Sequence, residues 1–181
     1  MEINRMYKIL LVFLVIFTAN STLARASDQI EISTLINDFF YHISEKDFIG
    51  ASKLFHYPPS YAEEKINKDV KDVSIFLEAL AYSFGQISEP TIYKGNSKIV
   101  SLQIGGGDIP YWKNNPEYLR IVFSVNFSKY GNGYVTLTIC NLANKYEIRE
   151  AKYGLDASVK NSTKLLQEAA GHIQLLFKNN Q

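Results

Sequence analysis

The spacing of apolar residues changes at Gly85, and this change constrains the fold more than any other feature of the chain. Before Gly85, apolar residues recur about every 3.6 positions, which places them on one face of an amphipathic helix. After Gly85 they alternate with other residues, as they do in strands that are buried on one face only. The chain is therefore predicted to be α+β, with helices first and an antiparallel sheet after them.

Three helices are predicted before Gly85, over residues 29–44, 48–55 and 69–84. Asp28 is expected to cap the first helix and Asp47 the second, because a short acidic side chain accepts hydrogen bonds from the first free backbone N–H groups. Pro58 and Pro59 prevent the second helix from continuing. Gly85 is a natural C-terminal stop for the third helix.

The alternating patterns after Gly85 predict five strands, over residues 91–94, 98–104, 118–127, 134–142 and 146–153. A hairpin turn is expected at residues 130–133, where the sequence is Tyr-Gly-Asn-Gly. The last pattern loses phase between Ile148 and Ala151, which predicts a β-bulge. Residues 157–177 return to helical spacing, and we expect this helix to dock on the body or, alternatively, to pair with a partner's helix.

The first residues have the pattern of a secretory signal peptide. Basic residues precede an apolar run at 9–17, and a small-residue cleavage pattern, Ala-Arg-Ala, ends at Ala26. A membrane anchor is the alternative, but the run is shorter than the roughly 20 residues that span a bilayer. We expect residues 1–26 to be removed and residues 27–181 to form one α+β domain. That domain would be periplasmic or secreted, without stable membrane insertion.

Charge and cysteine content exclude several functional classes. The 19 Lys and Arg side chains nearly balance the 18 Asp and Glu side chains, so nucleic acid is not expected as a partner. Cys140 is the only cysteine, which rules out an internal disulfide and any cysteine-based zinc site. It lies in the apolar run Thr-Leu-Thr-Ile-Cys, where a buried thiol is expected. No cofactor is expected.

Few residues have the chemistry of a catalyst. His56 and Asp47 are the candidates for a general base, but each also has a structural interpretation at a helix end. His42 is interpreted as a boundary residue of the first helix, and His172 as a margin residue of the last. Three histidines on three segments, without a closely spaced carboxylate partner, do not predict a metal site.

The candidates for ligand or partner contact are aromatic or basic. The segment 105–117 begins with three glycines but leads into no helix, so it is interpreted as a connection between strands and not as a phosphate loop. It carries Tyr111 and Trp112, which are expected either to contact a partner or to cover the open end of the core. Arg120 is expected to meet an anionic ligand or a surface carboxylate, and Tyr57 is the remaining candidate contact.

One resemblance rests on the run FFYHISEKDFIGASKLF and on HYPPSY leading to a helix that ends in FG. An aromatic pair, a charged corner and a Leu-Phe pair in this order resemble an exported branch of the nuclear-transport-factor-2-like (cystatin-like α+β) superfamily. The resemblance covers residues 28–153, and the C-terminal helix departs from the family plan. It implies a strongly curved antiparallel sheet wrapped around the N-terminal helices, with a cone-shaped pocket between them. Some members are isomerases, dehydratases or cyclases, many are non-catalytic binding modules, and many form dimers through the sheet.

The sequence as a whole favours an exported, non-enzymatic binding or assembly module for a small apolar molecule, a peptide or a protein partner. A pocket enzyme of the isomerase or dehydratase type, using His56 or a nearby acid, is one alternative. An inhibitor or immunity-type protein that presents Tyr111 and Trp112 is another. A cone filled with side chains would disfavour the enzyme, whereas a deep cavity with His56 or Asp47 pointing inward would favour it.

Overall fold

A computed structural model describes residues 26–93, 99–102, 118–142 and 145–179 of the chain. The elements in them are α2 (Ala26–Ser44), α3 (Phe48–Ser52), α4 (Glu63–Phe84), β1 (Ile87–Ile92), β2 (Ile99–Leu102), β3 (Tyr118–Phe127), β4 (Gly131–Leu142), β5 (Lys145–Asp156) and α5 (Ser162–Asn179). The helices that precede the sheet, and the single helix that follows it, confirm the predicted α+β class.

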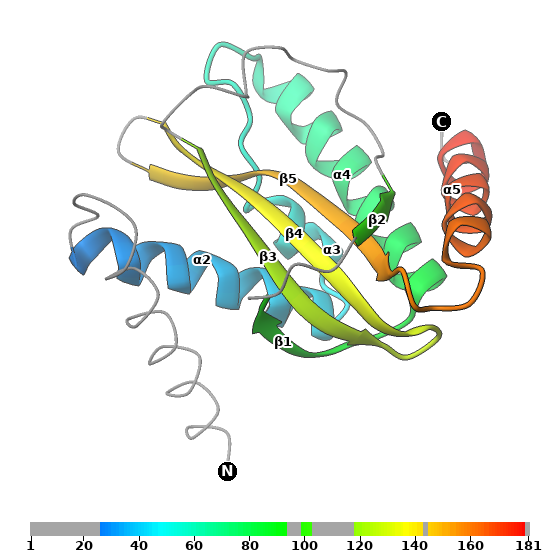
Figure 1. Ribbon diagram of the computed structural model, residues 1–181. Helices are drawn as coiled ribbons and strands as arrows, with labels where there is room; N and C mark the ends of the chain where they lie inside the picture. The colour runs from blue at the N-terminus through cyan, green and yellow to red at the C-terminus, as the bar shows by residue number, and fades with distance from the viewer. Residues whose placement is uncertain (1–25, 94–98, 103–117, 143–144, 180–181) are drawn as a thin grey trace.

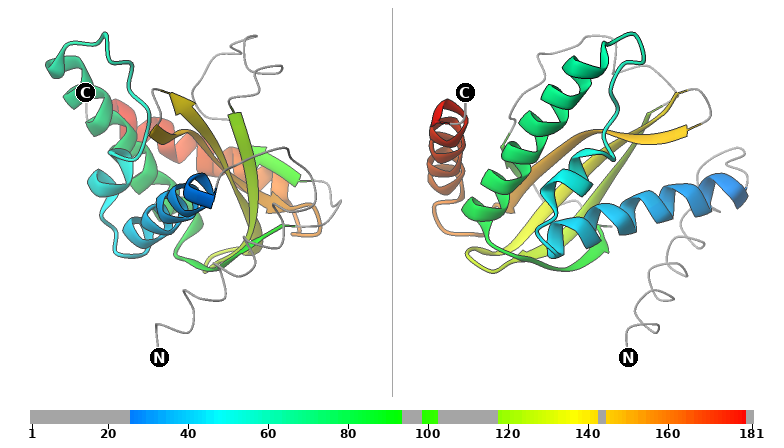
Figure 2. Two further views of the ribbon diagram at one scale, coloured as in Figure 1. Left: turned by 90° about the vertical axis from the view of Figure 1, so that its left-hand side faces the viewer. Right: turned by 180° about the vertical axis from the view of Figure 1, so that it is seen from behind.

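The five strands form one open, curved antiparallel sheet in the order β1-β3-β4-β5-β2. Helices α2, α3 and α4 cover the same face of this sheet (Figure 1). Helix α5 stands beside α4, near the edge strand β2 (Figure 2). The other face of the sheet therefore has no described helix over it.

Aromatic side chains fill the space between the helices and the sheet. Phe84 of α4 lies 5.6 Å, between ring centroids, from Tyr153 of β5, which in turn stacks on Phe127 of β3 at 5.7 Å. All three side chains are at most 1% exposed, as is Phe39 of α2. At this level the space between the helices and the sheet is a packed core.

The phase slip predicted near the end of the sheet is a β-bulge. Thr138 of β4 pairs with Glu150, but the next residue, Ile139, pairs with Ile148. Arg149 is the extra residue on β5, and a bulge of this kind redirects the side chain that it carries. The bulge prediction is confirmed.

The structure changes the predicted end of α3. The helix was expected to reach residue 55, but it ends at Ser52. The reason is a pairing with β5: the His56 N–H donates to the Ile148 carbonyl at 2.8 Å, and the Ile148 N–H donates to the Leu54 carbonyl at 2.9 Å. Sheet-type hydrogen bonds have replaced the last helical turn.

Other bounds shift by a few residues. Helix α4 begins at Glu63, six residues before the predicted start, and its first turn carries two acidic side chains that suit a helix N-terminus. Asp28 lies within the first turn of α2 and is not the residue before it. The β3–β4 turn falls at residues 128–130, and β4 opens with Gly131 at a φ of +76°.

Cys140 is fully buried, as predicted. Within the described ranges, no helix combines the length and the apolar character that crossing a membrane requires. The predicted signal peptide, residues 1–25 of which lie outside those ranges, stays a prediction.

Candidate functional site

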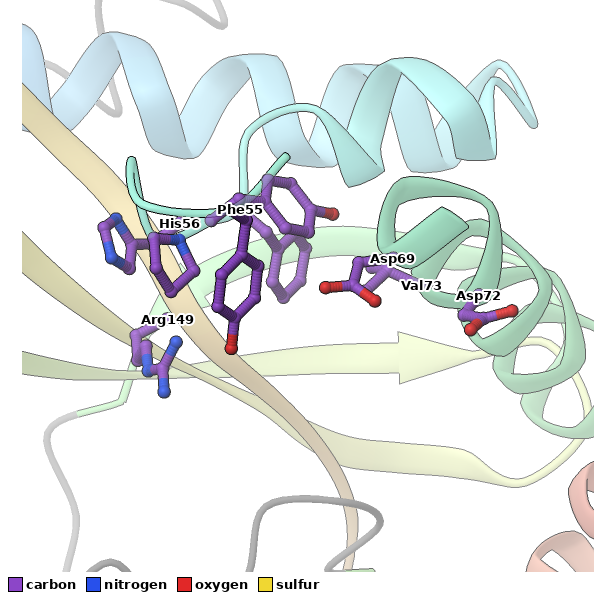
Figure 3. Close-up of a pocket in the computed structure, with 9 residues that line it drawn as sticks. Phe55, His56, Asp69, Asp72, Val73 and Arg149 are labelled. Atoms are coloured by element: carbon purple, nitrogen blue, oxygen red, sulfur yellow. The ribbon is translucent and has the colours of Figure 1, made fainter. Parts of the chain in front are cut away.

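A pocket of about 320 Å³ opens between the segment that follows α3, the first half of α4 and the bulge of β5 (Figure 3). Its lining combines aromatic rings with charges of both signs. The lining residues are Phe55, His56, Tyr57, Pro58, Tyr61, Asp69, Asp72, Val73 and Arg149.

Local structure explains why these side chains meet. The backbone pairing of residues 54–56 with β5 fixes the start of the segment. The Tyr57 hydroxyl donates to the Ser52 carbonyl at 2.9 Å, which turns the chain back toward α3. Asp69, Asp72 and Val73 are three and four positions apart on α4, so they share one face of that helix. The bulge supplies Arg149 from the sheet.

His56 is held by a carboxylate from β5. Its Nδ1 lies 2.6 Å from Glu147 Oε2, and the two side chains are only 12% and 19% exposed. Lys145 Nζ contacts the other carboxylate oxygen at 2.7 Å. Burial alone would raise the pKa of Glu147, but hydrogen bonds from Lys145 and His56 outweigh it and leave this pKa below its usual value. Glu147 therefore stays ionised and orients the imidazole.

The hydroxyl of Tyr57 stays protonated near the pocket. Burial raises its pKa, and the negative charge of Asp69 raises it further. Because this hydroxyl already donates to the Ser52 carbonyl, it can only accept a hydrogen bond from a bound molecule, as the Asp69 carboxylate in the lining also can.

Charges of opposite sign lie on opposite sides of the pocket. Figure 3 shows His56 and Arg149 on one side, and Asp69 and Asp72, both from α4, on the other. Phe55 lies between the two groups in the same view. The arrangement can take a small molecule that carries polar groups at both ends of an apolar body.

Asp47 lies elsewhere and has a structural role. It caps α3: its Oδ1 accepts a hydrogen bond from the Gly50 N–H at 2.8 Å, which confirms the predicted cap. Its Oδ2 lies 2.9 Å from His42 Nδ1. Its side chain is 50% exposed, and it is not among the residues that line the pocket.

The remaining predicted contacts are not brought together with the pocket. Arg120 is exposed on β3, opposite Thr138, and does not line the cavity. His172 stacks on Tyr82 of α4, with 4.8 Å between ring centroids. Tyr111 and Trp112 lie outside the described residues.

Sequence reasoning found His56 and Tyr57 but missed the residues opposite and beside them. No carboxylate lies close to a histidine in the sequence in a way that predicts a pair. In the structure, however, Glu147 contacts His56 from 91 positions away. The predicted bulge pointed to residues 148–151, but nothing in the spacing showed which segment would lie beside it. Within the described ranges, no three His, Cys, Asp or Glu side chains are grouped closely enough to hold a metal ion.

The comparisons with known proteins identify no family. No protein-family model matches the sequence, and no match is found among curated proteins. One similar solved structure is Rv3472, a protein of unknown function from Mycobacterium tuberculosis. It is 9% identical over 83% of this chain and 88% of that chain, with a TM-score of 0.42. A similarity of this size carries no argument about function.

Proposed function

We propose that the protein is a binding module whose ligand is a small molecule or a short peptide held in the pocket beside the β5 bulge. The observation that carries this proposal is the pocket itself, in which aromatic rings and charges of both signs face one cavity of about 320 Å³. Ligand sites combine an apolar lining with a few convergent polar groups in the same way, and this volume is at the lower end of their range.

The packing between the helices and the sheet supports binding at the pocket over chemistry deep in the fold. Phe84, Phe127 and Tyr153 fill the space between the helices and the sheet, where the family resemblance implies a pocket. Asp47 faces the surface as a helix cap and does not point inward. These features favour the non-enzymatic module that the sequence predicts.

Amide chemical shifts of the ¹⁵N-labelled chain, recorded with a library of small soluble fragments, test this proposal. Hits should move the amide signals of Tyr57, Asp72 and Arg149 together. Val73→Trp, which fills the cavity from α4, should abolish these shifts, whereas the matched control Glu78→Trp, on an exposed position of the same helix, should keep them. Hits that cluster elsewhere, or none at all, would contradict the proposal.

The buried pair of His56 and Glu147 favours a second candidate, a pocket enzyme of the isomerase or dehydratase type. A carboxylate on Nδ1 fixes the ring and favours a proton there, which makes Nε2 the basic nitrogen. A histidine oriented in this way on a pocket wall is suited to proton transfer.

A bound ligand distinguishes the two candidates. Incubation with the wild-type chain should leave the ligand's mass and its exchangeable carbon-bound protons in D₂O unchanged if the protein only binds. Deuterium uptake or loss of water from the ligand, abolished by His56→Gln, would instead establish the enzyme. Since His56→Gln removes the base but keeps a polar side chain, it also tests whether binding needs the imidazole.

We also propose that the chain is a distant relative of the nuclear-transport-factor-2-like superfamily and that it is exported. The order of the N-terminal helices and the curved sheet supports the first proposal, while α5 is an addition to the family plan. The basic, apolar and small-residue regions of residues 1–26 support the second.

A further inference from the structure

We propose that the pocket recognises a small zwitterion with an apolar body, such as a short peptide with both ends free. Its ammonium group would lie toward Asp69 and Asp72, and its carboxylate toward Arg149. This inference rests on the proposed binding function and specifies the class of ligand for the same site.

The carboxylate side of the pocket suits an ammonium group. Asp69 and Asp72 project from one face of α4 into the lining. The charge of Asp69 also contributes to the raised pKa of the Tyr57 hydroxyl. The ring of Tyr61, another lining residue, already has the Lys65 ammonium over it, with Nζ 3.4 Å from the ring centroid, so the carboxylates and not this ring would hold a ligand ammonium. Carboxylates hold ammonium groups through charge-assisted hydrogen bonds.

The opposite side suits a carboxylate. Arg149 carries a guanidinium, whose planar set of N–H donors matches the two oxygens of a carboxylate. The bulge gives this arginine its place in the pocket. His56 lies on the same side and is held by Glu147, so its ring is already positioned before a ligand enters.

Apolar surface separates the two charged sides. The apolar part of the lining consists of Phe55, Pro58 and Val73. Phe55 also packs on the core, because its ring centroid lies 6.4 Å from that of Phe39. A ligand body with apolar side chains would exclude water there and strengthen both terminal ion pairs. The charges of the lining therefore favour a molecule with one positive and one negative end over a molecule with a single charge.

The closest rival is a ligand that is only cationic, because two carboxylates face one guanidinium. The dipeptide Leu-Leu and two capped forms separate these cases without changing the protein. Leu-Leu amide keeps the ammonium alone, and N-acetyl-Leu-Leu keeps the carboxylate alone. Dissociation constants are measured for all three by isothermal titration calorimetry, and the sites by amide shifts.

Leu-Leu should bind at the pocket, and each capped form should bind about tenfold or more weakly, as expected for the loss of one charged hydrogen-bonded contact. Asp69→Asn with Asp72→Asn should weaken Leu-Leu but leave N-acetyl-Leu-Leu unchanged. Arg149→Gln should weaken Leu-Leu but leave Leu-Leu amide unchanged. This crossed pattern depends on which end meets which side, and a general loss of folding would not produce it.

Equal binding of Leu-Leu and either capped form would overturn the zwitterion and leave the binding function in place. The same conclusion follows if Leu-Leu fails to bind while other fragments shift the pocket amides. If neither Leu-Leu nor any fragment binds at the pocket, both proposals fall.

Discussion

At the scale of single residues, the hydrogen bond between His56 and Glu147 joins the segment after α3 to the last strand. The pair is mostly buried. A change in one partner would therefore leave His56 Nδ1 or Glu147 Oε2 without this hydrogen bond and largely shielded from water. Its role is therefore both to position the imidazole in the pocket wall and to hold the segment after α3 against β5.

Glu147→Gln should lower the free energy of unfolding by about 1–3 kcal/mol at pH 7, because a buried charged hydrogen bond is lost. In the folded chain the pKa of Glu147 lies below its ordinary value of 4.5. Unfolding therefore takes up a proton as the pH falls below that value, so the wild type loses stability there and the variant loses less.

Urea denaturation between about pH 3 and pH 7 measures both effects. Lys145→Met is the matched control: Lys145 contacts the same carboxylate but is 69% exposed, so its loss should cost less than about 0.5 kcal/mol. Parallel pH profiles for wild type and Glu147→Gln would contradict the assignment.

Two helical glycines should respond to alanine in opposite directions. In α3, a Cβ at Gly50 would overlap the Asp47 carboxylate and the His42 ring, so Gly50→Ala should destabilise the chain despite alanine's higher helix propensity. In α5, a Cβ at Gly171 meets nothing within 4 Å, so Gly171→Ala should stabilise it by about 0.5–1 kcal/mol. Thermal unfolding of the two variants should give shifts of opposite sign.

At the scale of elements, the hydrophobic pattern predicted most of the fold. The strand at residues 118–127 was predicted with the bounds that the structure has, because its alternation is unbroken. The predicted helix at α3 was too long, because the side chains that follow Ser52 keep helical spacing while the backbone of residues 54–56 pairs with β5. That pairing depends on Ile148, in a strand far along the chain, and leaves no local signal.

Helix α5 docks on the body through its apolar stripe, as expected. Leu166, Ala169 and Ile173 are at most 4% exposed, whereas Leu175 is 60% exposed. Ile173→Ala should therefore cost about 2–4 kcal/mol of unfolding free energy, and Leu175→Ala less than about 0.5 kcal/mol. Chemical denaturation of both variants checks this, and equal effects would show that α5 is not held on the body in solution.

At the scale of the whole molecule, the candidate site was predictable only in part. His56 and Tyr57 were identified because they end a helical run at a proline pair. Asp69, Asp72 and Arg149 appeared as ordinary helix and strand residues, and only the fold brings them to one cavity. Local spacing specifies elements, whereas a pocket depends on how elements far apart in sequence pack together.

Export is a prediction at the same scale. The natural product should begin close to Ser27, because the cleavage pattern ends at Ala26. N-terminal sequencing of the protein from its own host measures this directly. A mature chain that still begins at Met1 would refute it.

Native mass spectrometry of the protein purified from its own host tests the central claim, that the pocket holds a ligand, most directly. Wild type and Glu78→Trp should each carry the same additional small mass. Val73→Trp should lack it while remaining folded by its amide spectrum. Asp72→Trp, which blocks the cavity from a partly buried position, is the second variant and should lack it too. No bound mass in the wild type, or the same mass in both cavity-filling variants, would contradict the account.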